Sequence, residues 1–351
     1  MNRAIETTHL INKNKTLLEA LSQINGIEDD PLVLFVVDEE ARMVGTLTDG
    51  DARRALIGGA KVSDLAETVM HRNFNYLSQG KLDDVESIKR QRELRMKLVP
   101  VLDEDRRIVD IINLERYVSR LPVDAVLMAG GKGERLRPLT EKTPKPLLHV
   151  GEKTIIDHNV DRLVSFGLRN ITVTVNYLGE QIEKHFAEPR RGVQVRCVRE
   201  PRFLGTIGSV KFVPGFDNDT ILIMNSDLFT NINYEDFYLH FKKNGADMSV
   251  AAVPYTVSVP YGIFDLEGRN IRGLVEKPTY NYYANAGIYL IRKGIVKDIP
   301  DDTFFNATDL IEQLIREGKK VIRFPLNGTW IDIGNPQEYA KAQELVRHIE
   351  W

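Results

Sequence analysis

A short segment of the chain concentrates residue types that bind phosphate. Gly130, Gly131 and Gly133 directly follow the apolar run AVLMA, so their backbone N–H groups can approach an anion with no Cβ in the way. Arg135 stands two residues after the last of these glycines, and its planar guanidinium can bind a polyphosphate through two parallel hydrogen bonds. This spacing predicts a phosphate-binding loop.

A lysine follows in the sequence TPKP. Pro144 and Pro146 disfavour a helix, so we expect Lys145 to lie in an extended segment that presents one ammonium group rigidly. The region matches neither GxGxxG, the pattern of dinucleotide-binding folds, nor GxxxxGK followed by Ser or Thr, the pattern of P-loops. A nicotinamide-dependent enzyme is therefore disfavoured, although that class stays open as an alternative.

Two aspartates occur where apolar strands are expected to end. Asp227 follows ILIMNS, and Asp332 lies in WIDIG, two residues before Gly334. Taken alone, an aspartate in such a position is more often a turn former than a ligand. Whether either aspartate is a ligand depends on whether the fold brings it to the glycine loop.

Strands and helices alternate after Pro122. The apolar runs AVLMA and NITVTVN alternate with the amphipathic segments TIIDHNVDRLVSFG and LGEQIEKHF. This alternation predicts an α/β domain over 123–351 with a doubly wound, mostly parallel, Rossmann-like sheet. Ligands in such sheets bind beyond the carboxyl ends of the strands, which is where the glycines and both aspartates fall.

Residues 1–120 contain an internal repeat. VVDEEARMVGTLT at 36–48 aligns with VLDEDRRIVDIIN at 101–113, at an offset of 65. Each copy predicts a helix, two strands joined by an acidic turn, and a further helix start, at Asp51 or Leu114. We therefore expect a smaller α/β domain built from two repeats, about 1–60 and 61–120.

The composition is that of an ordinary globular protein. The chain has 351 residues, 42% hydrophobic and 28% charged, which is long enough for two domains. A net charge of -3 provides no general basic field for nucleic acid or an anionic membrane. A single cysteine, Cys197, excludes a disulfide framework, and no secretory leader or long apolar run is present, so we expect a cytoplasmic protein.

The segment 125–148 resembles the opening signature of the sugar-1-phosphate nucleotidyltransferases, a strand followed by AGGxGxRLxPLT and a downstream PKP. LGTIGSV at 204–210, VEKP at 275–278 and GTWIDIGNP at 328–336 resemble later motifs of the same family. The resemblance covers roughly residues 123 to 345 and is closest to mannose-1-phosphate guanylyltransferase-like members.

This resemblance implies a reaction and a metal. A phosphate oxygen of the sugar 1-phosphate would attack the α-phosphorus of a nucleoside triphosphate in line with the departing pyrophosphate. Arg135, Lys145, Asp227 and Asp332 would be the catalytic residues, and the two aspartates would hold Mg²⁺.

The resemblance also implies two groups of binding residues. Those for the nucleotide are Gly130, Gly131, Gly133, Leu204, Gly205 and Thr206. Those for the sugar phosphate are Glu276, Lys277, Asn285 and Gly287. A surface hairpin is the alternative interpretation of the second group.

The repeat in residues 1–120 resembles a tandem of cystathionine β-synthase (CBS) motifs, which commonly bind adenine nucleotides between two copies. Thr48 and Asp51 match the family's contacts to ribose and phosphate, whereas the second copy has Asn113 and Arg116 there. Because Arg cannot accept a hydrogen bond from ribose hydroxyls, at most one competent half-site is expected. A structural pair without a ligand is the alternative.

The base and the biological role stay open at this level. LGTIG resembles the loop of guanylyltransferases more than that of thymidylyltransferases, so GTP is favoured over UTP, CTP and dTTP. The arrangement of a CBS pair ahead of such a domain resembles that of enzymes that make activated amino sugars for bacterial surface glycans. The alternative of another class is an inactive protein that only senses nucleotides or sugars. Whether the chain forms a homo-oligomer is also open.

Overall fold

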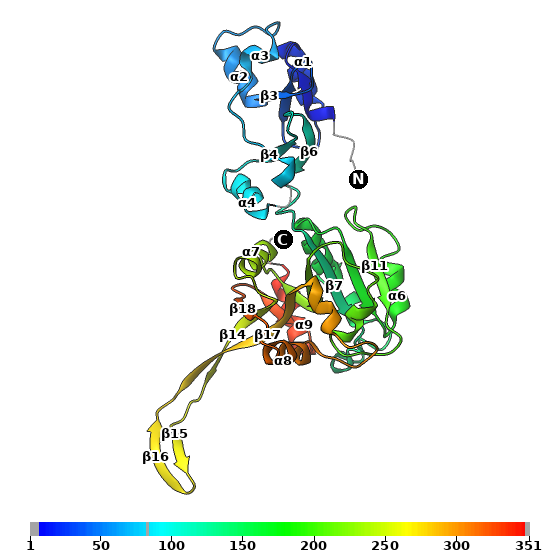
Figure 1. Cartoon of the computed structure of the whole chain (residues 1–351), viewed down its shortest axis with the longest axis vertical. Coiled ribbons are helices and arrows are strands. Elements are labelled where there is room, and N and C mark those ends of the chain that lie inside the picture. Colours follow the sequence, from blue (N-terminus) through cyan, green and yellow to red (C-terminus); the bar gives the residue numbers. More distant parts are fainter. Residues whose placement is uncertain (1–6, 82–83, 348–351) are drawn as a thin grey trace. The chain divides into compact units, whose positions relative to one another are not determined.

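The computed structural model describes residues 7–81 and 84–347, and no helix among them is long and apolar enough to cross a membrane. The chain divides into two compact units, Met1–Leu121 and Pro122–Trp351. Figure 1 colours the first unit blue to cyan and the second green to red.

A seven-stranded sheet forms the centre of the second unit. Its strand order is β11-β10-β7-β12-β17-β14-β18, and β17 alone runs antiparallel to its neighbours. The mostly parallel sheet is therefore confirmed, and β17 departs from it because the chain returns from β14 through a hairpin rather than a helical crossover. The strands are β7 (Val123–Ala129), β10 (Ile171–Val175), β11 (Val195–Arg199), β12 (Thr220–Asn225), β14 (Met248–Ser258), β17 (Thr279–Arg292) and β18 (Val321–Pro325).

Helices cover both faces of this sheet. Ile223 of β12 packs in one core cluster with Leu310 and Leu314 of α8. The next residue, Met224, points to the other face, where its sulfur lies 3.4 Å from the Tyr234 hydroxyl of α7. The α-helices of this unit are α5 (Ile155–Ser165), α6 (Gly179–His185), α7 (Tyr234–Lys243), α8 (Ala307–Arg316) and α9 (Pro336–Leu345). Its 3₁₀ turns are η3 (Glu134–Leu136), η4 (Lys145–Leu147), η5 (Gly208–Phe212) and η6 (Lys293–Asp298).

Two further strand pairs lie outside the large sheet. β13 (Leu228–Thr230) pairs with β19 (Trp330–Asp332), and β8 (His149–Val150) pairs with β9 (Lys153–Thr154). The first pair joins segments that are about a hundred residues apart in the sequence, and it contributes one of the expected aspartates.

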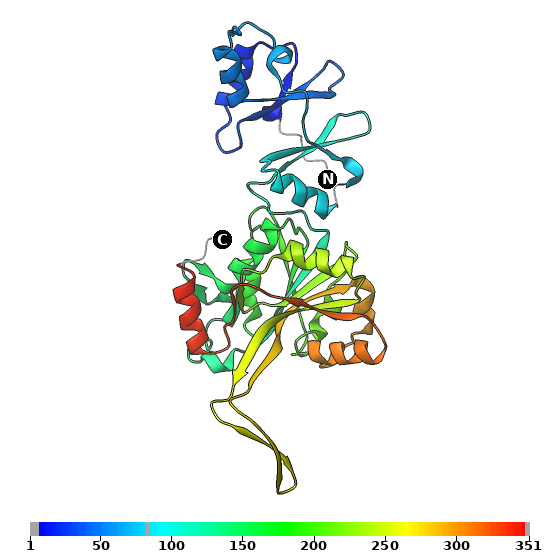
Figure 2. The same ribbon diagram turned by 90° about the vertical axis from the view of Figure 1, so that its left-hand side faces the viewer.

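β14 and β17 extend well beyond the sheet. Their ladder continues outward from Ala252↔Asn285 to Ser258↔Thr279, and a terminal hairpin of β15 (Ile263–Glu267) and β16 (Asn270–Val275) follows. We call residues 253–284 the arm. Figures 1 and 2 show it, in yellow, projecting from the rest of the second unit in both views.

The first unit contains the repeat as two three-stranded sheets, β1-β2-β3 and β4-β5-β6. In each, the first strand is parallel and the third antiparallel to the central strand. Phe35, Met43, Leu98 and Leu102 share one core cluster, so the two repeats pack on each other. The elements are η1 (Thr7–His9), β1 (Leu10–Asn12), α1 (Leu17–Asn25), β2 (Val33–Val37), β3 (Met43–Thr48), α2 (Asp49–Ile57), α3 (Ala66–Val69), β4 (Leu77–Ser78), η2 (Gln79–Lys81), α4 (Val85–Glu93), β5 (Leu98–Leu102) and β6 (Ile108–Asn113).

The helix expected after each strand pair forms in the first repeat alone. There Thr48 and Asp51 make a capping box that opens α2. After β6 the chain makes only a turn, in which Asn113 Oδ1 accepts the N–H groups of Glu115 and Arg116. The prediction of a helix at Leu114 is therefore wrong, because the turn lacks an acidic residue that would close a capping box.

Candidate functional site

The glycine loop joins β7 to η3, and its shape depends on Gly133. This residue has φ 63°, and a Cβ there would lie 3.0 Å from the Thr140 side chain and 3.2 Å from that of Lys145. Thr140 Oγ1 donates to the Gly133 carbonyl at 2.8 Å, which fixes the loop beside the Lys145 segment. Arg135 follows on η3, with its guanidinium 3.2 Å from the place a Cβ on Gly334 would take.

Lys145 is nearly buried, with 8% of its surface exposed. Its ammonium pairs with Asp227 Oδ2 and lies 3.9 Å from Asp332 Oδ1. The prediction of an extended segment is wrong, because Lys145 begins η4, and Pro146 fits the first turn of a helix, where no backbone N–H is required. The ammonium is held between the two carboxylates.

Asp227 and Asp332 meet across the β13–β19 pair. Asp332 is the register partner of Leu228, and the Ile333 N–H donates to the Asp227 carbonyl at 3.2 Å. Oδ1 of each aspartate is buried without a hydrogen-bond partner among the described residues. Burial, and then the charge of Asp227, raise the pKa of Asp332. Two buried carboxylate oxygens that lack partners suit a hard cation such as Mg²⁺.

The protein alone offers this cation few ligands. Within residues 7–81 and 84–347, no group of three or more His, Cys, Asp or Glu side chains is arranged to hold a metal ion. Asp227 and Asp332 would therefore bind Mg²⁺ together with oxygens from water or a phosphate. The site fits a cation that arrives with a polyphosphate better than a closed structural metal site.

A second loop follows β11 and contains Leu204, Gly205 and Thr206. Gly205 has φ 79°, and a Cβ there would lie 2.6 Å from the Phe305 carbonyl, so the loop requires glycine. Thr206 Oγ1 accepts the Ala307 N–H at 2.9 Å, which caps α8 and leaves the hydroxyl hydrogen free to donate. Leu204 is buried beneath the loop.

Glu200, which the sequence did not single out, connects the two loops. Its Oε2 accepts the Leu204 N–H at 3.2 Å, and a Cβ on Gly130 would collide with its Oε1. The residue is 4% exposed, and this burial raises the pKa of Glu200 to about 7. The sequence signal is a carboxylate just after a strand and before a glycine loop, which many turn formers share.

One cavity of about 610 Å³ collects most of the predicted residues. Its lining includes Gly130, Gly131, Lys132, Gly133, Arg135, Lys145, Phe203, Gly205, Thr206, Asn225, Ser226, Asp227 and Gly334. Asp332 reaches the same place through Lys145. Loops from the carboxyl ends of β7, β11 and β12 thus meet here, as expected for an α/β sheet.

The residues expected to bind the sugar phosphate lie in two separate places in the structure. Gly287, with φ 72°, lies against Asn225 of the cavity, since a Cβ there would be 2.7 Å from Asn225 Nδ2. Asn285 lies just outside and donates to the Tyr289 hydroxyl at 3.0 Å. Glu276 and Lys277 follow β16 on the exposed arm, nine and eight residues before Asn285. Within a single chain, Glu276 and Lys277 therefore lie on a surface hairpin, which is the alternative interpretation given for these residues in the sequence analysis.

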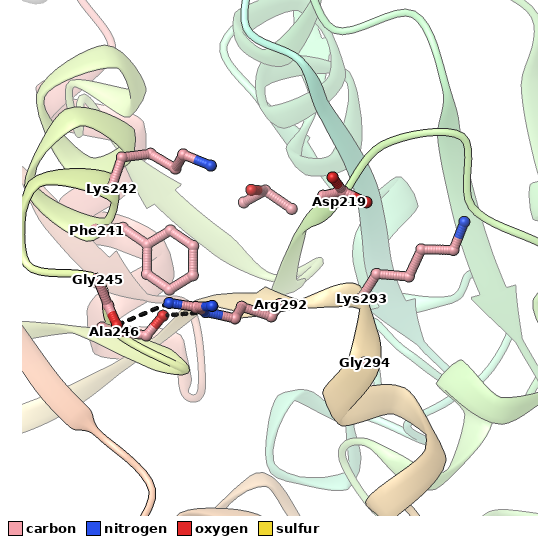
Figure 3. A pocket seen from close by; sticks show the side chains of 9 residues that line it. Asp219, Phe241, Lys242, Gly245, Ala246, Arg292, Lys293 and Gly294 are labelled. Atoms are coloured by element: carbon pink, nitrogen blue, oxygen red, sulfur yellow. Dashed lines mark hydrogen bonds between the residues drawn. The ribbon is translucent and has the colours of Figure 1, made fainter.

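A second cavity, of about 330 Å³, lies at the opposite end of the sheet, where β12 begins and β17 ends. Figure 3 shows Lys242, Arg292 and Lys293 around it. The guanidinium of Arg292 donates to the carbonyls of Gly245 and Ala246 at 2.8 and 2.9 Å, so this arginine serves the local backbone. No motif from the sequence falls in this cavity.

In the first unit, the expected nucleotide contacts are engaged locally. Thr48 Oγ1 donates to Asp51 Oδ2 at 2.6 Å, within the capping box of α2. At the matching place in the second repeat, Asn113 donates to Asp30 at 2.7 Å and Arg116 pairs with the same carboxylate at 3.0 Å. Asp30 of the first repeat therefore already pairs with both of these side chains of the second repeat.

Known proteins resemble the second unit. A family model described as nucleotidyl transferase matches residues 124–348. The catalytic subunit beta of mannose-1-phosphate guanylyltransferase from Xenopus tropicalis is 26% identical over 242 residues, 65% of this chain and 67% of that protein. A mannose-1-phosphate guanyltransferase from Yarrowia lipolytica is 30% identical over 225 residues, 61% of each chain. The structure of HddC from Yersinia pseudotuberculosis complexed with GMP-PN is 25% identical, with a TM-score of 0.51, and matches 64% of this chain and 99% of HddC.

Replacing Glu200 with Gln is expected to stabilise the protein at alkaline pH. The carboxyl has an ordinary pKa near 4.5 and a folded-state pKa raised to about 7, so its contribution to folding is lost as the pH rises between these values. Gln keeps an acceptor for the Leu204 N–H and removes the ionisation. The free energy of unfolding should increase by up to about 3 kcal/mol at pH 8 and by much less at pH 5. Urea unfolding at both pH values measures this, and equal changes would contradict the assignment.

Proposed function

The chain belongs to the nucleotidyl transferase family, and we propose that it transfers a nucleoside monophosphate from a nucleoside triphosphate to a sugar 1-phosphate with release of pyrophosphate. The observation that carries this proposal is the position of Lys145. Its buried ammonium lies between Asp227 and Asp332 in the cavity that the glycine loop and Arg135 also line. A cation, two carboxylates and a glycine loop in one cavity are the groups that a magnesium polyphosphate requires.

The chemistry of this transfer suits the residues that are present. The nucleophile is a phosphate oxygen that already carries negative charge, so no proton has to be removed before it attacks. A new bond forms from this oxygen to the α-phosphorus while the bond to the β-phosphate oxygen breaks. Among the described residues that line the cavity, no His or Cys occurs. Catalysis would then consist of positioning and charge neutralisation.

Each charged residue has a separate task in this proposal. The glycine loop and Arg135 bind the β- and γ-phosphates, where negative charge grows as pyrophosphate leaves. Lys145 neutralises charge at the α-phosphate, and its rigid burial fixes the direction of the ammonium. Asp227 and Asp332, whose Oδ1 atoms have no hydrogen-bond partner among the described residues, would hold Mg²⁺. Bound Mg²⁺ would supply further neutralisation of the triphosphate.

We favour GTP as the nucleotide and a mannose-like sugar 1-phosphate as the acceptor. Support comes from the relatives, which carry the name mannose-1-phosphate guanylyltransferase, and from HddC in complex with GMP-PN. UTP, CTP and dTTP remain alternatives with the same chemistry. A sensing protein without turnover is disfavoured because the full set of charged residues is present.

A grid of four nucleoside triphosphates against a panel of sugar 1-phosphates tests the proposal. We expect Mg²⁺-dependent pyrophosphate release, fastest with GTP, only when a sugar 1-phosphate is present. In the same assay, Lys145→Ala should lower the rate by on the order of 10²-fold to 10³-fold, because one preorganised cation is lost. Lys242→Ala, at the opposite cavity, is the matched control and should retain wild-type activity. No pyrophosphate from any combination would overturn the proposed function and favour sensing.

The metal assignment makes a separate prediction. Asp227→Asn and Asp332→Asn should each raise the Mg²⁺ concentration for half-maximal activity by about tenfold or more, since an amide leaves the cation less charge compensation. Asp219→Asn, which also changes a cavity-lining aspartate but at the other end of the sheet, should leave the Mg²⁺ dependence unchanged. Magnesium titrations of all four proteins measure the difference. A Mg²⁺ dependence unaffected in Asp227→Asn would remove that residue from the metal site.

For the first unit we propose a CBS pair with one adenine-nucleotide half-site at Thr48 and Asp51. The support is that Thr48 and Asp51 match the CBS pattern and lie together at the start of α2, where a ribose would have to replace their contacts with each other and with Arg54, whereas Asn113 and Arg116 are held by Asp30. AMP or ATP should raise the melting temperature of the wild type, and Asp51→Ala should abolish this ligand-dependent increase. Asp84→Ala, which removes the N-cap of α4, is the matched control and should keep it. An unchanged ligand response in Asp51→Ala would exclude this half-site.

A further inference from the structure

The arm exposes much of the apolar surface of the described chain. Of the twenty-one large apolar side chains that are exposed among the described residues, eleven lie between Tyr255 and Tyr283, so the arm is the main apolar surface to be explained. Among them are Tyr261, Phe264, Leu266, Ile271, Leu274 and Tyr282. A two-stranded ribbon is at best marginally stable alone, and apolar patches of this kind mark interaction surfaces. The arm is therefore the candidate interaction surface of this chain.

Its own unit does not cover this surface. The β14–β17 ladder runs without interruption from Ala252↔Asn285 to Ser258↔Thr279, so the arm continues the direction of two strands of the central sheet. In this structure no residue of the arm lines the cavity of its own chain. A second copy of the chain offers an alternative, because two identical arms can pack side by side about a two-fold axis, each covering the other.

The root of the arm lies at the cavity. Gly287 of β17 lies against Asn225, which lines the cavity, and Asn285 follows just outside. Lys277 is eight residues farther out, about 25 Å away, since an extended strand advances about 3.3 Å per residue. When two arms lie antiparallel with their roots at that separation, Lys277 of each arm reaches the root of the other. It then faces the other chain's cavity.

The mouth of the cavity has an apolar surface that matches the arm. Phe203 lines the cavity and is exposed, and its ring contacts that of Phe304 with centroids 5.9 Å apart. Outside the arm, Phe203 and Phe304 are two of the four large exposed apolar side chains described in the second unit, so they provide a landing site for the arm's apolar tip.

The charges point to the same arrangement. The cavity's cations, Lys132, Arg135 and Lys145, lie on the glycine-loop side, whereas Asn225, Ser226 and Asp227 from the β12 side carry no positive charge. A second phosphate next to the triphosphate needs another cation. Lys277 has φ 44°, a conformation that non-glycine residues adopt mostly at turns and functional sites, and no described residue forms a hydrogen bond or ion pair with its side chain.

We propose that two copies of this chain exchange arms, so that Glu276 and Lys277 of each copy complete the acceptor side of the other copy's cavity. Lys277 pairs with the phosphate of the sugar 1-phosphate, and Glu276 accepts hydrogen bonds from sugar hydroxyls. This inference rests on the proposed function for the identity of the acceptor. The pairing of the arms rests on the apolar surface alone.

The first experiment measures mass by light scattering during gel filtration. The wild type should elute as a dimer of about 80 kDa, twice the 40.0 kDa of one chain. Phe264→Asp combined with Leu274→Asp should give a folded monomer, and Ile315→Asp, an exposed apolar change on α8, should remain a dimer. A monomeric wild type, or an arm variant that remains dimeric, would overturn the exchange.

The second experiment tests whether each site is shared between chains. Lys145→Ala and Lys277→Ala chains with different tags are co-expressed and purified through both tags, so that every dimer is mixed. Each homodimer should be nearly inactive. With exchanged arms, one of the two sites in a mixed dimer combines an intact cavity with an intact arm, and activity should return to about half of wild type. Arg135→Ala replaces Lys145→Ala if the latter does not fold.

A reciprocal mixed dimer is the matched control. It pairs a wild-type chain with a chain that carries both Lys145→Ala and Lys277→Ala. Exchanged arms leave neither of its sites intact, so activity should be nearly absent, whereas sites contained within one chain would give about half. Inactivity of the first mixed dimer, or half activity of the second, would overturn the shared site.

A third readout does not depend on activity. A photoreactive p-benzoyl-phenylalanine at position 264 should cross-link the two chains of the dimer near Phe203 or Phe304, and mass spectrometry of the peptides identifies the partner segment. If this cross-link forms while no triphosphate and sugar 1-phosphate pair releases pyrophosphate, the proposed function fails and the arm exchange stands. A cross-link only within one chain, or to a segment remote from the cavity, would overturn the exchange.

Discussion

The candidate site depends on one buried ammonium held between two carboxylates. Removing the Lys145 ammonium from water is unfavourable unless nearby negative charge compensates it, and the Asp227 and Asp332 carboxylates supply that charge. The burial of Lys145 therefore depends on both carboxylates. Because the three residues come from η4, the turn after β12, and β19, this compensation also requires that these separate segments be assembled together.

The parts of the molecule that follow from local patterns could be predicted from the sequence. The strand and helix alternation predicts the sheet, and the glycines, Arg135 and Lys145 are recognisable because the proposed contact of each depends on its own backbone or side chain. The register of β13 with β19 is a contact between distant segments that no local pattern predicts, and only a motif points to Asp332. The prediction of an extended backbone at Lys145 is wrong because proline is compatible with the start of a 3₁₀ turn as well as with an extended chain.

Two features escape a local interpretation for physical reasons. The role of Glu200 depends on burial between loops that are far apart along the chain, and no pattern near residue 200 encodes that burial. The direction of the arm is equally hidden, because a strand with apolar side chains has the same alternation whether it folds over a cavity or extends from it. A motif therefore points to Glu276 and Lys277, but it does not predict where the arm places them.

The pairing of β13 with β19 has a consequence for the order in which the protein can be made. The strands β7, β10, β11 and β12 leave the ribosome well before β19, and parallel pairs among them can form early. Asp332 emerges more than a hundred residues after Asp227, so Lys145 has only one of its two carboxylates until nearly the whole chain has been synthesised. The site is thus completed late in synthesis, and a chain terminated before β19 would carry the phosphate loop without a complete charge cluster.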